Sequence, residues 1–173
     1  VPSLPEDICT AIKTRLRLIS WFYPKCDLRY NGEKIAIKAK SIAEMFPDDS
    51  VVVNTDNVYA LIYPTEDTNE VLTYVNGLYL KRDGTHVDYI TNAVVRDVRE
   101  KLVKKYKNIK PGDIKNRLGV VLFFNNFPNC QFDSQTKERL TNSERDIGDY
   151  LRETEIIDKL SKKVIAYKVS TDN

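Results

Sequence analysis

The sequence predicts an α+β domain, on three observations. Strand-like runs fill much of the first half of the chain, up to 70–74. A single apolar stripe then predicts a long helix from Val87 to about Tyr106. The most strand-like run, Gly119 to Phe127, follows, and further helical segments come after it. Several strands, a long helix, a strand and more helices form a pattern typical of two packed layers.

The bulk composition is that of an ordinary globular domain. The 173 residues fit one domain, 1–173, and are 42% hydrophobic and 30% charged. No apolar run approaches the ~20 residues of a membrane helix, so we expect no membrane contact. The net charge of +2 favours no partner by itself. The chain begins with Val1 instead of Met, and we expect it to be a piece of a longer polypeptide.

The cysteine and histidine pattern argues against a metal site. Cys9, Cys26 and Cys130 are far apart in sequence, and His86 is the only histidine. Zinc sites need Cys and His in close, repeated spacing. We therefore predict no bound metal, and three unpatterned cysteines favour a reducing compartment.

The N-terminal segment predicts a helix followed by a hairpin. Pro5 and the acids after it are typical of a helix start, and an apolar stripe at helical spacing follows. This stripe predicts an amphipathic packing helix, and it consists of Ile8, Ile12, Leu16 and Ile19. Asn31-Gly32 lies between the strand-like runs 27–30 and 34–40, and that dipeptide is a strong hairpin signal.

The middle of the chain alternates short elements with turns. A short helical segment, 41–46, is expected to end at Pro47, and the runs 51–53 and 58–63 are expected to be strands. Thr85 followed by Asp88 fits a helix N-cap with an acidic partner. The stripe of the long helix comprises Val87, Ile90, Val94, Val98 and Leu102.

A basic segment follows this helix. Between Arg96 and Arg117 nine basic residues face only three acids. One interpretation is a solvated helix end, where lysines complement the helix dipole. The other is a contact with the phosphates of double-stranded DNA. The candidate DNA-binding residues are Lys104, Lys105, Lys107 and Lys110.

The last third of the chain contains the most distinctive segment, a polar loop from Pro128 to Asn142. It follows the buried strand at 119–127, so it is delivered to an edge of the sheet. Ser143 followed by Asp146 is then expected to cap a helix, with a break near Thr154 before a second one.

Three motifs between Leu72 and Asn142 carry a family resemblance. They are Tyr-Val-Asn-Gly at 74–77, Gly-Thr-His-Val-Asp-Tyr at 84–89 and Phe-Asp-Ser-Gln-Thr-Lys-Glu at 132–138. In this order, with a basic segment between the last two, they resemble the transducer domain of eukaryotic-type topoisomerase II. Eukaryotes and some large DNA viruses carry this type. The first helix and the hairpin match more weakly, so the resemblance extends over the chain.

The resemblance implies a fold and a place in a larger protein. The implied fold is a mixed sheet of about four strands with helices on one face and a left-handed βαβ crossover. A GHKL nucleotide domain would precede this segment, and a DNA-cleaving core would follow it. The chain lacks a glycine-rich phosphate loop and the carboxylate cluster of a cleavage core. Alone, it is expected neither to hydrolyse ATP nor to cut DNA.

The resemblance also implies roles for the polar loop. Lys137 would touch the terminal phosphate of ATP held by the neighbouring domain, and Gln135 would position that phosphate or the attacking water. Lys137 and Gln135 are thus the candidate catalytic residues, and with Thr136 they are the candidate cofactor-binding residues. Mg²⁺ would belong to the parent enzyme and not to this fragment. The parent enzyme would be a homodimer acting on double-stranded DNA.

Two positions depart from the family pattern. Asp83 stands where the family usually has a glycine, and Cys130 stands where a proline commonly precedes the lysine loop. Both bear on local backbone geometry and favour a divergent, viral-type member.

The compartment would be the nucleus for a cellular protein, and the host cytoplasm or nucleus for a viral one.

Two other readings stay open at this point. One is the corresponding middle domain of another GHKL ATPase, a chaperone or a mismatch-repair protein. The other is a free-standing nucleic-acid-binding module that uses the patch from Lys104 to Lys110. The Gln-Thr-Lys string with Gly-Thr-His upstream argues against the first. The modest net charge argues against the second.

Overall fold

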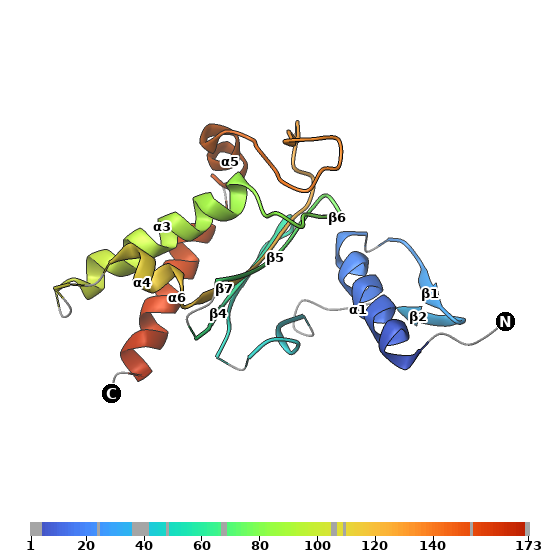
Figure 1. The fold of residues 1–173 in the computed structure, drawn as a ribbon, viewed down its shortest axis with the longest axis horizontal. Coiled ribbons are helices and arrows are strands. Elements are labelled where there is room, and N and C mark those ends of the chain that lie inside the picture. The colour runs from blue at the N-terminus through green and yellow to red at the C-terminus, as the bar shows by residue number, and fades with distance from the viewer. Residues whose placement is uncertain are drawn as a thin grey trace. The chain divides into compact units, whose positions relative to one another are not determined.

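The chain forms two compact units, Val1–Phe46 and Pro47–Asn173. The structure is a computed structural model. It describes residues 5–23, 25–35, 42–47, 49–66, 69–104, 107–108, 110–152 and 154–171, with the backbone alone from 164 onward. Figure 1 shows the elements of both units. The assignment of 1–173 to one domain stays a prediction.

The first unit contains a helix and a hairpin. Helix α1 spans Glu6–Phe22 and packs against strands β1, Leu28–Tyr30, and β2, Glu33–Ile35. Asn31 and Gly32 join the strands with φ of 49° and 83°, as a tight hairpin turn requires, so the predicted hairpin is confirmed. The predicted extension of the second strand to Lys40 lies outside the described residues.

The predicted apolar stripe of α1 is only partly buried. Ile8 is 44% exposed, whereas Leu18 and Phe22, which lie off that stripe, are buried. Ile12, Leu16 and Ile19 have intermediate burial. Two three-residue strands are too short to cover a 17-residue helix along its whole length.

The second unit is built on a five-stranded mixed sheet in the order β3-β4-β7-β5-β6. The central strand β7 pairs antiparallel with β4 and parallel with β5. The strands are β3, Val51–Asn54; β4, Val58–Pro64; β5, Glu70–Val75; β6, Leu78–Tyr79; and β7, Leu118–Phe124. The mixed sheet is confirmed, and the handedness of the β5–α3–β7 crossover stays a prediction.

Strand β6 is the strand of this sheet that the sequence reasoning missed. It forms a hairpin with β5 through Asn76 and Gly77, whose φ values are 52° and 83°. This is the same dipeptide signal as Asn31-Gly32. It explains why the sheet has five strands where about four were expected.

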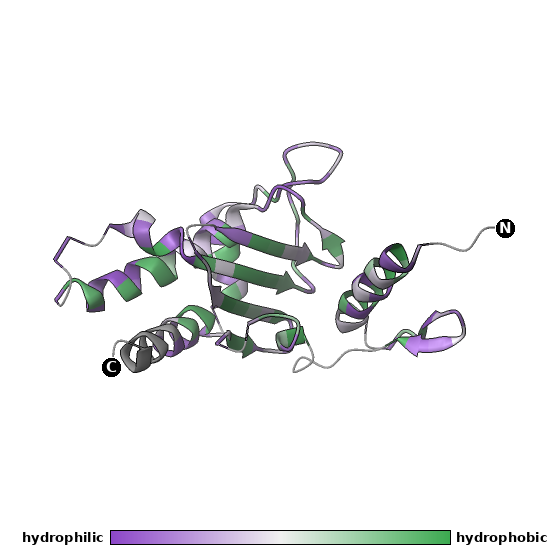
Figure 2. Cartoon of the chain, turned by 60° about the horizontal axis from the view of Figure 1, so that its bottom comes forward, coloured by the Kyte–Doolittle hydropathy of each residue, from purple (hydrophilic) through white to green (hydrophobic). Residues whose placement is uncertain are grey.

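Helices cover one face of the sheet (Figure 1). They are α3, Thr85–Leu102; α4, Pro111–Lys115; α5, Glu144–Leu151; and α6, Ile156–Thr171. The predicted stripe of α3 is confirmed, because Val87, Ile90, Val94 and Val98 are all buried. They pack with Val58, Ala60 and Ile62 of β4 and Val120, Leu122 and Phe124 of β7. Apolar residues dominate the central strands of this sheet (Figure 2).

The helix ends agree with the predictions in part. Ser143 caps α5 by accepting from the Asp146 amide at 3.3 Å, as predicted. Helix α3 ends at Leu102, and Tyr106 lies outside the described residues. Its N-cap is Gly84, so the prediction of Thr85 as the cap is wrong. The Thr85 amide donates to the Leu140 carbonyl at 3.0 Å. A backbone carbonyl from another segment thus accepts from the first turn of α3, in place of a capping side chain.

The opposite face of the sheet is also buried and is rich in aromatic rings. Tyr59 stacks on Phe123 with ring centroids 5.6 Å apart, and Tyr74 meets Phe123 edge-on at 5.4 Å. Leu61 and Val121 complete this set and are fully buried. Burial on both faces explains why β7 is a continuous apolar run without alternation.

Gly119 makes room for a side chain that crosses the sheet. Tyr63 of β4 lies over Gly119 of β7, and its hydroxyl donates to Glu70 of β5 at 2.7 Å. Burial, followed by the Glu70 hydrogen bond, raises the pKa of Tyr63 to about 12. A Cβ at position 119 would lie 2.1 to 2.5 Å from Tyr63 ring carbons. Any larger residue there must displace the ring.

We predict that Gly119→Ala lowers the free energy of unfolding by about 1–3 kcal/mol, the usual cost of overpacking. Urea unfolding measures it. Gly112→Ala is the matched control, since a Cβ at Gly112 meets no atom within 4 Å. Introducing Tyr63→Leu beside Gly119→Ala should recover part of the loss. An equal loss with and without Tyr63→Leu would contradict the steric explanation.

Candidate functional site

The polar loop after β7 is closed at its base by backbone pairing. Phe132 forms an antiparallel bridge with Leu140, and Leu140 also bridges in parallel to Gly84. The Arg82 amide donates to the Glu138 carbonyl at 2.8 Å. The loop is therefore rooted in the segment that leads into α3. Figure 1 shows it projecting away from the sheet.

Two asparagines shape the approach to this loop. Asn142 is 1% exposed, accepts from the Gln131 amide at 2.7 Å and donates to the Asn129 carbonyl at 2.9 Å. Asn76 accepts from the Phe127 amide at 2.8 Å and donates to the Phe127 carbonyl at 2.9 Å. Sequence reasoning missed both roles. In the sequence, the only signals were that Asn76 belongs to the Tyr-Val-Asn-Gly motif and that Asn142 is the last residue of the polar loop.

The tip of the loop presents the predicted site residues to solvent. Gln135, Thr136 and Lys137 are all exposed. Lys137 has a φ of 53°, and its amide donates to the Ser134 carbonyl at 3.2 Å. The Ser134 and Thr136 hydroxyls are hydrogen-bonded at 2.6 Å. The structure thus brings the predicted residues together on one tight turn.

The Lys137 ammonium contacts an aromatic ring. Its Nζ lies 5.7 Å from the centroid of Phe132, at the base of the same loop. An exposed cation–π contact of this kind is worth only about 0.5–1 kcal/mol. The amine can therefore leave the ring for a stronger anionic partner at small cost.

The segment before α3 explains the Gly-Thr-His motif and one departure from it. Asp83 has a φ of 65°, a left-handed conformation that glycine adopts without steric cost. That geometry accounts for the glycine usual at this position. At Gly84 a Cβ would lie 2.7 Å from both the Leu140 Cβ and the His86 Nδ1, so only glycine fits. Burial, and then the Asp88 carboxylate, raise the pKa of Asp83, and Arg139 opposes them.

His86 is a buried structural residue. It is fully buried, and its Nε2 lies 2.7 Å from the Thr73 hydroxyl, which donates to the Leu122 carbonyl at 2.8 Å. Since that hydroxyl proton is already used, Nε2–H must be the donor to Thr73. Burial, with the Arg139 charge as a second cause, lowers the pKa of His86 to about 3. The ring is neutral at pH 7 and ties α3 to two strands.

Cys130, the second departure, is partly buried near the start of the polar loop. Its thiol accepts from the Asn76 side-chain amide at 3.3 Å. Burial raises the pKa of the thiol, so it stays protonated at neutral pH.

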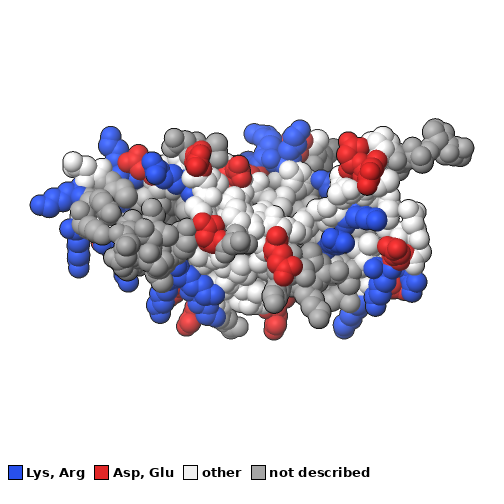
Figure 3. All heavy atoms as spheres, turned by 90° about the horizontal axis from the view of Figure 1, so that it is seen from below, with Lys and Arg blue, Asp and Glu red and all other residues white. Residues whose placement is uncertain are grey.

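The basic segment lies at the far end of α3 from the loop. Lys104, Lys107 and Lys110 are exposed, and Lys105 lies outside the described residues. The Lys110 amide donates to the Asp113 carboxylate at 3.1 Å, which fixes the start of α4. Figure 3 shows Lys and Arg side chains on the part of the second unit where α3 ends. The geometry permits contact with a polyanion.

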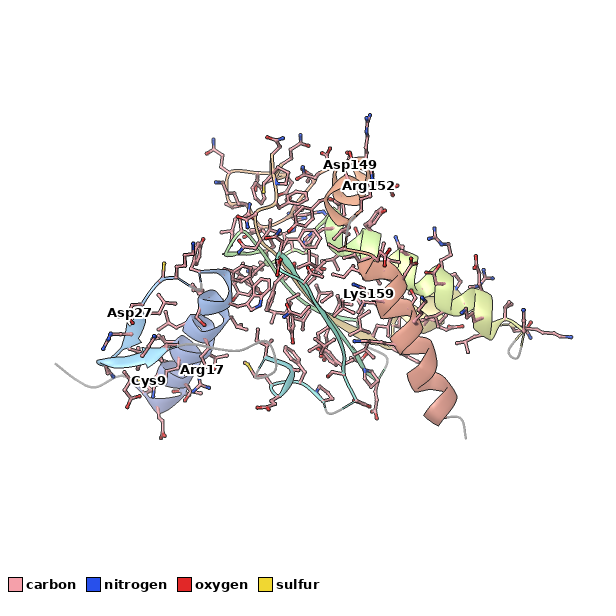
Figure 4. The ribbon with its side chains drawn as sticks, turned by 180° about the vertical axis from the view of Figure 1, so that it is seen from behind. Cys9, Arg17, Asp27, Asp149, Arg152 and Lys159 are labelled. Carbon is pink, nitrogen blue, oxygen red and sulfur yellow. The ribbon has the colours of Figure 1, made fainter. Side chains whose placement is uncertain are left out.

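A shallow pocket on the second unit offers no comparable chemistry. Its wall includes Tyr150 and Thr154, whose hydroxyls donate to the carbonyls of Asn57 and Leu151. Figure 4 labels Lys159 of α6, which also lines this pocket. Within the described ranges, no three His, Cys, Asp or Glu side chains gather as metal ligands would. Nor does any described helix combine the length and apolar character needed to cross a membrane.

Comparison with known sequences gives a consistent set of relatives. A family model described as DNA gyrase B matches residues 27–172. The large subunit of the DNA topoisomerase of enterobacteria phage T4 is 27% identical over 139 residues, 80% of this chain and 27% of that protein. DNA topoisomerase 2 of Candida glabrata is 30% identical over 196 residues, 96% of this chain and 14% of that protein. This chain thus spans only a small part of these relatives.

Solved structures with the same fold come from the same group. The ATPase and transducer domains of DNA topoisomerase II from Balamuthia mandrillaris match with a TM-score of 0.64 and 23% identity, over 100% of this chain and 48% of that one. The ATPase region of Saccharomyces cerevisiae topoisomerase II bound to ICRF-187 matches with a TM-score of 0.63 and 23% identity, over 99% of this chain and 46% of that one. These likenesses establish the fold.

Proposed function

The chain belongs to the DNA gyrase B family as a transducer domain of a type IIA DNA topoisomerase, and we propose that it couples ATP use in the adjacent GHKL domain to DNA strand passage. Lys137 is the contact point with the terminal phosphate of ATP. The observation that carries this proposal is the exposed Lys137 tip on a loop whose base is fixed by backbone pairing.

A lysine is suited to this task for electrostatic reasons. Its ammonium is a compact charge with three donors, and a terminal phosphate presents several anionic oxygens. Among the described residues, the Lys137 ammonium contacts only the Phe132 ring. The amine can therefore turn toward a phosphate on a neighbouring domain. Because the loop arrives from a different domain, this contact forms only when both domains close.

The other loop residues support that contact. The exposed Gln135 amide can donate to a phosphate oxygen or orient the attacking water. The hydrogen bond between the Ser134 and Thr136 hydroxyls holds the turn in shape, with Thr136 lying beside the phosphate. Mg²⁺ belongs to the parent enzyme in this proposal and is not bound by this fragment. The fragment alone is inactive.

The proposal is tested by replacing Lys137 in the parent enzyme and comparing ATP hydrolysis with DNA cleavage. The expected outcome is loss of hydrolysis with cleavage retained.

The parent enzyme is a homodimer whose partners are the ATP-binding domain, the DNA-gate core and double-stranded DNA. It acts in the nucleus of a cell, or in the nucleus or cytoplasm of a host if it is viral.

The basic segment is the proposed DNA contact. Lys104, Lys107 and Lys110 are exposed at one end of the second unit, and Lys105 completes the set in sequence. Contacts of this kind bind phosphates without reading sequence. They would let DNA held by the enzyme stimulate ATP use in the domain upstream.

Changing Lys104, Lys105, Lys107 and Lys110 to Gln in the parent enzyme should abolish DNA-stimulated ATP hydrolysis and leave basal hydrolysis intact. The slope of log affinity against log salt should fall by about 0.9 for each phosphate contact removed. A variant with Lys25, Lys34 and Arg145 changed to Gln removes three exposed charges elsewhere and is the control. An unchanged slope would leave these lysines only the role of complementing the helix dipole.

The family assignment also bears on the alternative readings. A chaperone or mismatch-repair domain is disfavoured by the match of residues 27–172 to the DNA gyrase B model. A free-standing nucleic-acid-binding module is disfavoured by the same match.

A further inference from the structure

Two arginine–aspartate pairs join the polar loop to the segment before α3 and to α3 itself. Arg82 of that segment reaches Asp133 on one flank of the loop at 3.1 Å. Arg139 on the other flank reaches Asp88 of α3 at 3.3 Å. The loop contributes one partner to each pair, so each flank is held separately.

The Arg139 side chain is held by a second contact besides its ion pair. Its guanidinium also donates to the Arg82 carbonyl at 3.2 Å, so it is held at two points. The Arg139 and Asp88 side chains are 33% and 48% exposed, and those of Arg82 and Asp133 are 60% and 27% exposed, so both pairs are partly open to solvent. Solvent and salt weaken an exposed pair most, and a two-point contact restricts orientation as well as distance.

Arg139 lies close enough to the loop tip to affect the position of Lys137. It lies two residues after Lys137, and its own carbonyl accepts from the Asp133 amide across the loop base at 3.3 Å. Asp88 lies in the first turn of α3, which is fixed to the sheet through the buried Val87 and Ile90. The arginine thus connects the exposed loop tip to a packed helix.

We propose that Arg139 and Asp88 are positioning residues that hold the loop so that Lys137 is aimed at the ATP phosphate, and that they link the loop to α3. This inference rests on the proposed function. Neither residue touches ATP in this arrangement. Their contribution is the orientation of Lys137 and the rigidity of the path between loop and helix.

The test uses the parent enzyme with Arg139→Gln, Asp88→Asn and the double variant. Each single change should lower kcat for ATP hydrolysis by about 10- to 100-fold, the cost of a misplaced catalytic group. KM for ATP should stay within about threefold, since the adenine and ribose contacts are not on this loop. The double variant should be no worse than either single variant, because both remove the same interaction.

The matched control is Arg152→Gln. Arg152 pairs with Asp149 in α5, away from the loop, and Figure 4 labels both residues. Its kcat should equal that of the unmodified enzyme. Amide hydrogen exchange gives a readout independent of activity: the Arg82 and Asp133 amides, which close the loop base, should exchange faster in Arg139→Gln and unchanged in Arg152→Gln.

Lys137→Ala in the same assay separates the two proposals. Loss of hydrolysis in Lys137→Ala with normal kcat in Arg139→Gln overturns the positioning role alone. Normal hydrolysis in Lys137→Ala overturns the proposed function and this inference with it. Effects of Arg139→Gln and Asp88→Asn that multiply in the double variant would show that the residues act separately, and would overturn the pair.

Discussion

Lys137→Ala in the parent enzyme is expected to lower ATP turnover by about 10²–10³, the usual effect of removing one fixed donor to a developing charge. Strand passage should be abolished with it, because in the proposed mechanism the domain motion depends on the same contact. DNA cleavage should survive, since the proposed cleavage core lies outside this chain. Nucleotide affinity should fall only modestly. Parallel measurements of hydrolysis, strand passage, cleavage and nucleotide binding check all four expectations.

The backbone at this position requires a second variant. Lys137 has a φ of 53°, a conformation that alanine tolerates poorly and asparagine tolerates well. Lys137→Asn therefore removes the amine while keeping the turn, and it should lose as much turnover as Lys137→Ala. Lys81→Ala removes an exposed lysine outside the loop and should have no effect. Near-normal turnover in both Lys137 variants would make this segment an ordinary surface turn.

Local patterns predicted most of the secondary structure. The stripe of α3 and the strands β3, β4, β5 and β7 follow from periodicity and apolar runs, because each reports burial of its own residues. Asn31-Gly32 predicted a hairpin for the same local reason. Asn76-Gly77 has the same positive φ values. The strand that follows it, β6, has only two residues and shows no periodic pattern, so the sequence did not predict it.

The anchoring of the loop could not be predicted from the sequence. Arg82 and Asp133, and likewise Asp88 and Arg139, are 51 residues apart. Their meeting depends on β5 and β7 lying side by side, which places the end of one connection next to the start of the other. Tertiary context likewise replaced the expected Thr85 cap with the Leu140 carbonyl.

The resemblance supplied what periodicity could not. It implies roles for Lys137 and Gln135 in a proposed site, where composition alone favoured a surface turn. The structure adds the reason for two family preferences. Position 83 needs a left-handed backbone, and position 84 has no room for a Cβ against Leu140 and His86.

Acid is expected to destabilise the second unit through His86. Its folded pKa is about 3, because burial disfavours the charged ring and the Arg139 charge adds to this, and its unfolded value is about 6.5. Between these values the unfolded chain binds a proton that the folded chain does not. The free energy of unfolding therefore falls by about 1.4 kcal/mol for each pH unit below 6.5, or about 3 kcal/mol by pH 4. Above pH 6.5 this contribution is fully present.

His86→Gln isolates this effect from the titration of the carboxylates. The Gln amide can still donate to the Thr73 hydroxyl but binds no proton in this range. The variant should be less stable than the unmodified chain at pH 7, since the ring packs edge-on against Phe124 at 5.2 Å. That difference should shrink by about 3 kcal/mol between pH 6.5 and pH 4. Urea unfolding of both proteins across this range measures it. A difference that stays constant with pH would mean that His86 is protonated in the folded state, which its hydrogen bond to Thr73 and its complete burial argue against.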